Sequence, residues 1–178
     1  MGTEEKLLHD IKNGKREAQR SLYDRYSSIA MSVCLRYMGN EEDARDVLQD
    51  AFIKIFTRIG DIKFQGEGTL KGWILKVTAN EALNTLRRRV IFSDTDNLPD
   101  LPEEESPDVE NVPLEVLMQM IGSLPTGYRT VFNMFVIEQN THKEIASQLG
   151  IKVSSSASQL LRAKKILANM INEYVKTK

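Results

Sequence analysis

The sequence predicts an all-α protein with two helical domains, an acidic proline-rich linker between them and a C-terminal helix-turn-helix. On both sides of residues 91–113, apolar residues recur at spacings of three and four, the period of an amphipathic helix. The segment between holds four of the five prolines and eight acidic residues, with no basic one. We therefore expect domains at residues 1–90 and 114–178, with residues 91–113 as the linker.

The linker is predicted from its composition. Each proline removes a backbone donor and keeps its predecessor out of the helical region, and clustered like charges extend the chain. The net charge of −1 hides this contrast. Residues 1–90 carry 16 basic against 13 acidic residues, and residues 114–178 carry 8 against 4. Two mildly basic domains are thus expected to flank an acidic linker.

The N-terminal domain is expected to contain about four helices. They are predicted near residues 3–12, from after Asn13-Gly14 to Met38, from Asn40 to about Ile59, and from Thr69 to Arg87-Arg88-Arg89. Asn40 suits a helix cap because its side chain can accept from the free amides of the first turn. The segment Gly60–Gly68 contains three glycines and is expected to be a loop.

The C-terminal domain is expected to contain four more helices. Pro113 and Pro125 suit helix starts, where no amide donor is needed. Thr141 and Glu144 form a capping box that begins a short helix ending at Gly150. The last helix is predicted from about residue 153 to 174. Its apolar stripe is expected to pass through Ala157, Leu160, Leu167, Ile171 and Tyr174.

Residues 143–151 have the pattern of a helix-turn-helix. Ala146 is the small residue where two helices touch, and Gly150 stands four residues later in the turn, where glycine permits a left-handed backbone. An ordinary helical hairpin would look similar. The following helix favours DNA binding, because polar residues that contact bases and phosphates are expected to project from it: Ser154, Ser155, Ser158, Gln159, Arg162 and Lys165.

A second polar stripe lies on the fourth predicted helix. Lys76, Asn80, Asn84 and Arg88 recur at a spacing of four and share one face. Asparagine is a weak helix former, so its repetition favours a contact surface over a merely solvated face, which is the alternative. The preceding loop offers a surface for an unstacked base through Lys63, Phe64, Gln65 and Thr69. Phe64 and Trp73 are as readily core residues.

Several classes of protein are disfavoured by the sequence. No apolar run approaches the length of about 18 residues that spans a bilayer, so membrane insertion is not expected and the expected compartment is the cytoplasm. His9 and His142 lack metal-ligand spacing, and the single cysteine, Cys34, cannot form an internal disulfide. We expect no catalytic residue, metal or cofactor, and therefore no enzyme.

Three stretches carry a resemblance to a known family. They are Asp43-Ala44-Arg45-Asp46-Val47-Leu48-Gln49-Asp50-Ala51-Phe52-Ile53-Lys54-Ile55-Phe56, Gly72-Trp73-Ile74-Leu75-Lys76-Val77-Thr78-Ala79-Asn80, and Leu124-Pro125 before the helix-turn-helix. In this order around an acidic linker, they resemble extracytoplasmic-function sigma factors of the sigma-70 family. The resemblance covers nearly the whole chain.

The resemblance implies partners and sites. The first domain would bind the clamp helices of core RNA polymerase through Asp46, Gln49, Asp50, Ile53 and Phe56. The helix with Lys76, Asn80 and Asn84 would read the minus 10 element of promoter DNA, and the Phe64 loop would receive a flipped base. The second domain would bind the minus 35 element and the polymerase flap. An anti-sigma factor that clamps both domains is also implied.

One departure from the family pattern concerns Ala157, which stands where related recognition helices often carry a basic residue. Fewer phosphate contacts are expected there. Two alternatives to a sigma factor remain at this point. A conventional helix-turn-helix regulator would bind operator DNA without polymerase, often as a dimer on a palindrome. A protein-binding scaffold would leave the stripes with Asn80 and Arg162 unexplained.

Overall fold

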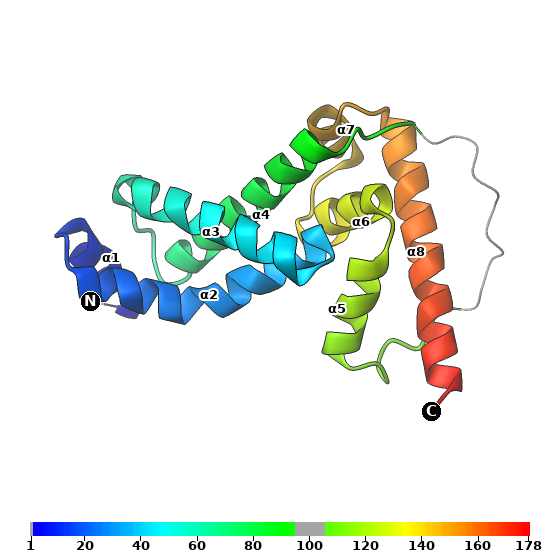
Figure 1. Ribbon diagram of the computed structural model, residues 1–178, viewed down its shortest axis with the longest axis horizontal. Coiled ribbons are helices and arrows are strands. Elements are labelled where there is room, and N and C mark those ends of the chain that lie inside the picture. The colour runs from blue at the N-terminus through cyan, green and yellow to red at the C-terminus, as the bar shows by residue number, and fades with distance from the viewer. Residues whose placement is uncertain (1, 95–105) are drawn as a thin grey trace. The chain divides into compact units, whose positions relative to one another are not determined.

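The computed structural model describes residues 2–94 and 106–178, and its described elements are all helical, as predicted (Figure 1). The chain divides into two compact units. Unit 1 comprises Met1–Leu35 and Asn40–Thr85, and unit 2 comprises Arg36–Gly39 and Leu86–Lys178. The middle of the predicted linker, residues 95–105, lies outside the described residues.

Unit 1 contains the four predicted N-terminal helices. They are α1 (Thr3–Lys12), α2 (Arg16–Met38), α3 (Glu41–Arg58) and α4 (Thr69–Arg89), with a 3-10 turn, η1 (Ile59–Asp61), after α3. The predicted cap of α3 is present, since the Asn40 side chain accepts from the Asp43 N–H at 2.9 Å. The ends of α2 and α4 pass into unit 2.

The core of unit 1 is built from the apolar faces of its helices. Its members come from every element of the unit: Leu8, Ile11, Ala18, Leu22, Tyr26, Ala30, Phe52, Ile55, Ile59, Ile62, Leu70 and Ile74. A buried carboxylate of α4 also lies in this unit. Glu81 of α4 is 3% exposed and forms an ion pair with Lys54 of α3. This core and this pair fix α4 against α3 and leave the opposite face of α4 to solvent.

Unit 2 contains the four predicted C-terminal helices. They are α5 (Leu114–Ser123), α6 (Thr126–Phe132), α7 (His142–Leu149) and α8 (Val153–Lys176), with a π-helical turn, η2 (Asn133–Ile137), after α6. Pro113 and Pro125 occupy the capping positions before α5 and α6, close to where the sequence placed them. Leu124, Ala163 and Leu167 form the core where these helices meet α8.

A buried guanidinium organises unit 2. Arg129 of α6 is 7% exposed and donates mainly to backbone carbonyls, with one longer bond to the Thr126 hydroxyl at 3.5 Å. The carbonyl acceptors are those of Tyr37 at 2.7 Å, Leu124 at 3.0 Å, Gly122 at 3.1 Å and Met38 at 3.2 Å. These include two of the last carbonyls of α2, which the helix itself leaves without donors. Arg129 therefore caps the end of α2 from another helix.

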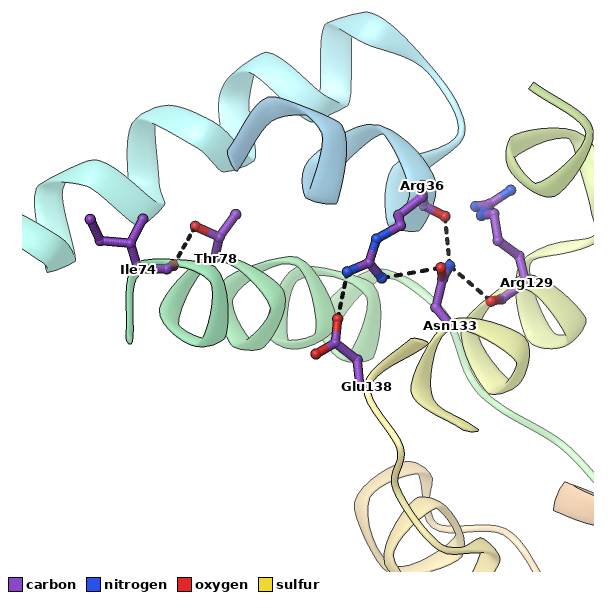
Figure 2. Close-up of polar contacts among 6 residues, drawn as sticks. All are labelled: Arg36, Ile74, Thr78, Arg129, Asn133 and Glu138. Carbon is purple, nitrogen blue, oxygen red and sulfur yellow. Dashed lines mark hydrogen bonds and ion pairs between the residues drawn. The ribbon is translucent and has the colours of Figure 1, made fainter. Parts of the chain in front are cut away.

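Asn133 and Arg36 extend this cluster (Figure 2). The fully buried Asn133 amide donates to the Arg36 carbonyl at 2.7 Å and to the Arg129 carbonyl at 3.0 Å. The Arg36 guanidinium donates to the Asn133 side-chain oxygen at 3.2 Å and pairs with Glu138 at 2.6 Å. Each polar group named here has a partner, as buried polar groups require.

Candidate functional site

The helix-turn-helix of unit 2 is formed by α7 and α8. Both bonds of the predicted capping box are present: the Glu144 N–H donates to the Thr141 hydroxyl, and the Thr141 N–H donates to the Glu144 carboxylate at 2.7 Å. Gly150 ends α7 in the left-handed conformation, with φ of +67°. Ala146 of α7 is buried, at 6% exposure. The helix-turn-helix prediction is therefore confirmed as a fold.

The polar residues of α8 divide into two groups. Ser154 is exposed, and Ser158, Arg162 and Lys165 are half-buried. Ser155 and Gln159 are instead buried, at 1% and 3% exposure. The prediction that all six project away from the core is therefore wrong for these two.

The predicted apolar stripe of α8 also needs one correction, because Ala157 is exposed. The reason is rotational. The inward face of α8 runs through Ser156, Leu160, Ala163 and Leu167 at spacings of three and four, so that Ala157 points outward. Ala157 therefore lies on the solvent-exposed side of α8.

The first residues of the linker lie against the start of α8. The Asp94 carboxylate accepts from the Lys152 N–H at 2.9 Å and from the Ser155 hydroxyl. The Gln159 side chain donates to the Ser93 carbonyl at 3.2 Å. The bonds from the Ser155 hydroxyl and the Lys152 N–H hold the pKa of Asp94 below its ordinary value. The burial of Ser155 and Gln159 thus coincides with linker contacts.

The polar stripe of α4 lies where the sequence predicts it. Lys76 and Asn80 are exposed and Asn84 is half-buried, while Arg88 is exposed in the last turn. The opposite face carries Ile74 and Thr78, both fully buried, and the Thr78 hydroxyl donates to the Ile74 carbonyl at 2.8 Å (Figure 2). The polar group on the inward face is satisfied inside the helix, whereas the amide side chain of Asn80 is left at the surface.

The loop before α4 is fastened by α1 at its start and by the first residue of α4 at its end. At its start, the Lys12 ammonium donates to the Ile62 carbonyl at 2.8 Å. At its end, the Thr69 hydroxyl donates to the Gly66 carbonyl at 2.7 Å. Phe64, within the loop, is half-buried against the core of unit 1, and so is Trp73 of α4. Phe64 is both a core contact and a partly accessible ring.

Glu4 of α1 caps α4 from outside that helix. Its carboxylate accepts from the N–H groups of Gly68 at 2.8 Å, Leu70 at 3.1 Å and Lys71 at 3.3 Å, and from the Tyr26 hydroxyl at 2.8 Å. Burial raises the pKa of Glu4, but these hydrogen bonds outweigh burial and the pKa lies below its ordinary value. Burial and the bond to Glu4 raise the pKa of Tyr26 to about 12.

Glu4→Gln is expected to destabilise unit 1 by about 2 to 3 kcal/mol, because an amide NH2 would face the N–H donors that now share a carboxylate. The pKa of Glu4 is lower in the folded protein than in the unfolded chain. Its contribution to the free energy of unfolding is therefore present above the unfolded-state pKa and is lost as the pH falls through the folded-state pKa. The difference in the free energy of unfolding between wild type and Glu4→Gln should therefore become smaller toward about pH 3.

Urea unfolding across this pH range measures that gap. Glu5→Gln is the matched control, since Glu5 is only half-buried and lies one position farther round α1. An equal loss in both variants, or a gap that widens in acid, would show that Glu4 does not cap α4 as described.

The predicted polymerase-binding residues lie on α3. Asp46, Gln49 and Asp50 are exposed, and Ile53 is 65% exposed although it is apolar. Their spacing places them on one face of the helix. Phe56 differs, because it is half-buried and its ring lies 5.9 Å from that of Phe52. The exposed face of α3 is therefore acidic and amide-bearing around one apolar side chain.

Sequence reasoning missed Glu4, Arg129 and Asn133 as organising residues. Each forms hydrogen bonds with residues at least 64 positions away in the sequence. Helical periodicity reports local neighbours only, so it cannot show such pairs. The one available hint was a charged or amide residue at a position that the apolar pattern marks as inward.

Among the residues that the structure describes, no group of three or more His, Cys, Asp or Glu side chains could hold a metal ion. Within the same part of the chain, no helix is long and apolar enough to cross a membrane.

Two family models match the chain. The one described as Sigma-70 region 2 matches residues 22–90, and the one described as Sigma-70, region 4 matches residues 114–167. The first spans most of α2, α3 and α4, and the second spans α5 to the middle of α8. Both models therefore fall on the helices that carry the sites described above.

Curated proteins are also similar. The ECF RNA polymerase sigma-E factor of Haemophilus influenzae is 24% identical, with 95% of each chain covered. The ECF RNA polymerase sigma factor SigW of Bacillus subtilis is 24% identical, covering 94% of this chain and 96% of that protein. For SigE of Mycolicibacterium smegmatis, the identity is 27% over 78% of this chain and 56% of that protein, so the chain spans little more than half of that relative.

Two solved structures resemble the chain. One is the sigma factor RpoE with the anti-sigma factor NepR from Bartonella quintana, with a TM-score of 0.49, 15% identity and coverage of 86% of this chain and 96% of that one. The other is CnrH with the cytosolic domain of CnrY, with a TM-score of 0.46, 20% identity and coverage of 94% and 96%. Because two sigma-70 family models and the curated relatives match it, the chain belongs to the sigma-70 family. It is an extracytoplasmic-function sigma factor, which directs transcription initiation.

Proposed function

We propose that this sigma factor binds core RNA polymerase through the exposed face of α3. Ile53 is the observation that carries the proposal, because an apolar side chain that is 65% exposed beside Asp46, Gln49 and Asp50 has no role in the core of unit 1. An apolar centre with an acidic rim suits the basic clamp helices of the polymerase. Phe56 supports this surface from its half-buried position.

The minus 10 element is assigned to α4 and the loop before it. Lys76 and Arg88 supply positive charge for phosphates, and Asn80 and Asn84 supply amides that can pair with base edges. Phe64 offers a partly accessible ring on which a flipped base can stack. Glu4 and Lys12 act as positioning residues, since they hold the two ends of this loop.

The minus 35 element is assigned to α8 of the helix-turn-helix. Ser154, Ser158, Arg162 and Lys165 are at least partly accessible on that helix and form the available contact surface. The net positive charge of residues 114–178 suits a DNA ligand. We assign domain roles accordingly: residues 1–90 for core enzyme and the minus 10 element, and residues 114–178 for the minus 35 element and the flap.

The remaining proposals concern the linker, the anti-sigma partner, catalytic activity and the compartment. The acidic linker, residues 91–113, is proposed to enter the polymerase toward its active centre, and an anti-sigma factor is proposed to clamp both domains. The relatives are sigma factors, which are not enzymes, and we propose that this chain has no catalytic activity and acts in the cytoplasm.

Asn80→Ala is expected to impair promoter opening about tenfold or more while leaving the affinity for core enzyme within about twofold, because Asn80 is exposed on α4 and supports no core contact. Permanganate footprinting of the melted region measures opening, and a gel-shift titration with core enzyme measures binding. Gln19→Ala, an exposed amide on α2, is the matched control. Equal loss of opening and core binding would mean that Asn80 is structural.

A further inference from the structure

Tyr23 of α2 is the one aromatic residue among the exposed large apolar side chains of the described chain. It is 44% exposed, whereas Leu22 and Tyr26 beside it on α2 are buried in the core of unit 1. Among the described residues the Tyr23 hydroxyl has no hydrogen-bond partner, while the Tyr26 hydroxyl donates to Glu4 at 2.8 Å. The core of unit 1 therefore does not account for the exposed ring of Tyr23.

The Tyr23 ring lies where α2 meets α3 in unit 1 (Figure 1). Its centroid is 4.8 Å from that of the buried Phe52 ring, and the two ring planes are inclined at 61°. The Phe52 ring is in turn 5.9 Å from that of Phe56. Edge-to-face contacts of this kind favour a defined orientation of each ring. Tyr23 is therefore held at the surface by a buried partner on α3.

The same contact places Tyr23 at the border of the α3 face that is proposed to bind polymerase. Gln49, Phe52, Ile53 and Phe56 are three, one and three residues apart, so they form one strip along α3. Phe52 is the buried edge of this strip, and Ile53 is its exposed apolar residue. Because Tyr23 packs on the Phe52 edge, the apolar surface continues from α3 onto α2.

Charged side chains flank the ring on α2. Arg20 lies one turn before Tyr23 and Asp24 directly follows it; both are exposed, and their charged groups are 3.8 Å apart. A partly exposed aromatic ring with a polar surround has the composition of an interface hot spot. Tyrosine suits this position because its side chain has only two torsions and loses little conformational entropy on binding. The ring is thus already oriented for contact with a partner.

We propose that Tyr23 is an aromatic anchor for core RNA polymerase, so that the binding surface spans α2 and α3 and Tyr23 sets part of the affinity for core enzyme. This role rests on the proposed function of the α3 face. In the complex the ring is buried against the polymerase, and the hydroxyl bonds a polar group there. Helix α2 then has a binding function besides its part in the core of unit 1.

Titration of labelled core enzyme with the full chain compares wild type, Tyr23→Ala, Tyr23→Phe and Leu35→Ala. Tyr23→Ala should weaken binding about tenfold or more, because it removes the whole ring. Tyr23→Phe keeps the ring and should lose no more than about threefold, since it removes one hydrogen bond. Leu35→Ala is the matched control, because it truncates an exposed apolar side chain about 18 Å farther along the same helix. Its affinity should stay within about twofold of wild type.

A second readout separates contact with polymerase from support of Phe52. At saturating concentrations of the sigma factor, Tyr23→Ala should initiate transcription at the wild-type level, because only its affinity is reduced. Tyr23→Lys replaces it as the test variant if the alanine variant fails to fold. The hydrocarbon stem of lysine still covers Phe52, but its ammonium would face the basic clamp helices and should weaken binding about tenfold or more.

Two results would overturn the role of Tyr23. One is binding of Tyr23→Ala within about twofold of wild type. The other is weaker binding together with a lower transcription level at saturation, which would make Tyr23 a structural support of Phe52. Ile53→Asp is titrated in parallel. If it weakens binding and Tyr23→Ala does not, the α3 face keeps its proposed function and only the part assigned to α2 is lost; if neither weakens binding, both fail.

Discussion

Arg129→Met is expected to lower the free energy of unfolding of unit 2 by about 3 to 5 kcal/mol, the range for removing one partner from a buried charged network. The guanidinium now satisfies the carbonyls of Tyr37, Met38, Gly122 and Leu124. Methionine fills part of the volume but donates nothing, so these buried acceptors would be left without that donor. Burial lowers the pKa of Arg129, but a guanidinium stays protonated in proteins.

Hydrogen exchange of the α6 amides in urea measures this effect within unit 2. Arg129→Lys should lose less stability, because an ammonium can still reach some of the carbonyls. It replaces Arg129→Met as the test variant if the methionine variant fails to fold. Arg87→Met is the surface control, since Arg87 is exposed. A loss below about 1 kcal/mol in Arg129→Met would contradict the described role of the cluster.

Ile53→Asp is expected to weaken the complex with core RNA polymerase about thirtyfold or more. This is the loss of affinity typical of changing a residue at the centre of an interface. The side chain is 65% exposed, so the change should leave the stability of unit 1 within about 0.5 kcal/mol. An aspartate there would place a charge at the apolar centre of the α3 face, where no partner is expected.

Leu35→Asp provides the matched control for this prediction. Leu35 is 38% exposed and lies on α2, so an apolar side chain is replaced by the same charge away from the proposed surface. Titration of labelled core enzyme measures both affinities. If the two variants bind core enzyme equally well, the α3 face is not the polymerase-binding surface.

Most of the helical architecture was predictable because its determinants are local. Asn40, the Thr141 and Glu144 capping box and Gly150 act within one helical turn, and each takes its expected role. Helical spacing placed Lys76 and Asn80 together on the exposed face of α4. Local chemistry was therefore enough for the elements and for the stripe on α4.

The parts that escaped prediction depend on distant segments. The α8 pattern suggested that serine and glutamine side chains point outward, but Ser155 and Gln159 are buried and bonded to Asp94 and Ser93. Those contacts span about 60 residues, beyond what periodicity reports. The cap that Glu4 provides to α4 escaped for the same reason.

Transcription with purified core RNA polymerase on a genomic template, followed by mapping of transcript starts, tests the central claim most directly. The account predicts a stable complex with core enzyme and initiation at a discrete set of starts that core enzyme alone does not use. Failure to form that complex, or binding to palindromic duplexes as a dimer with no effect on polymerase, would contradict it.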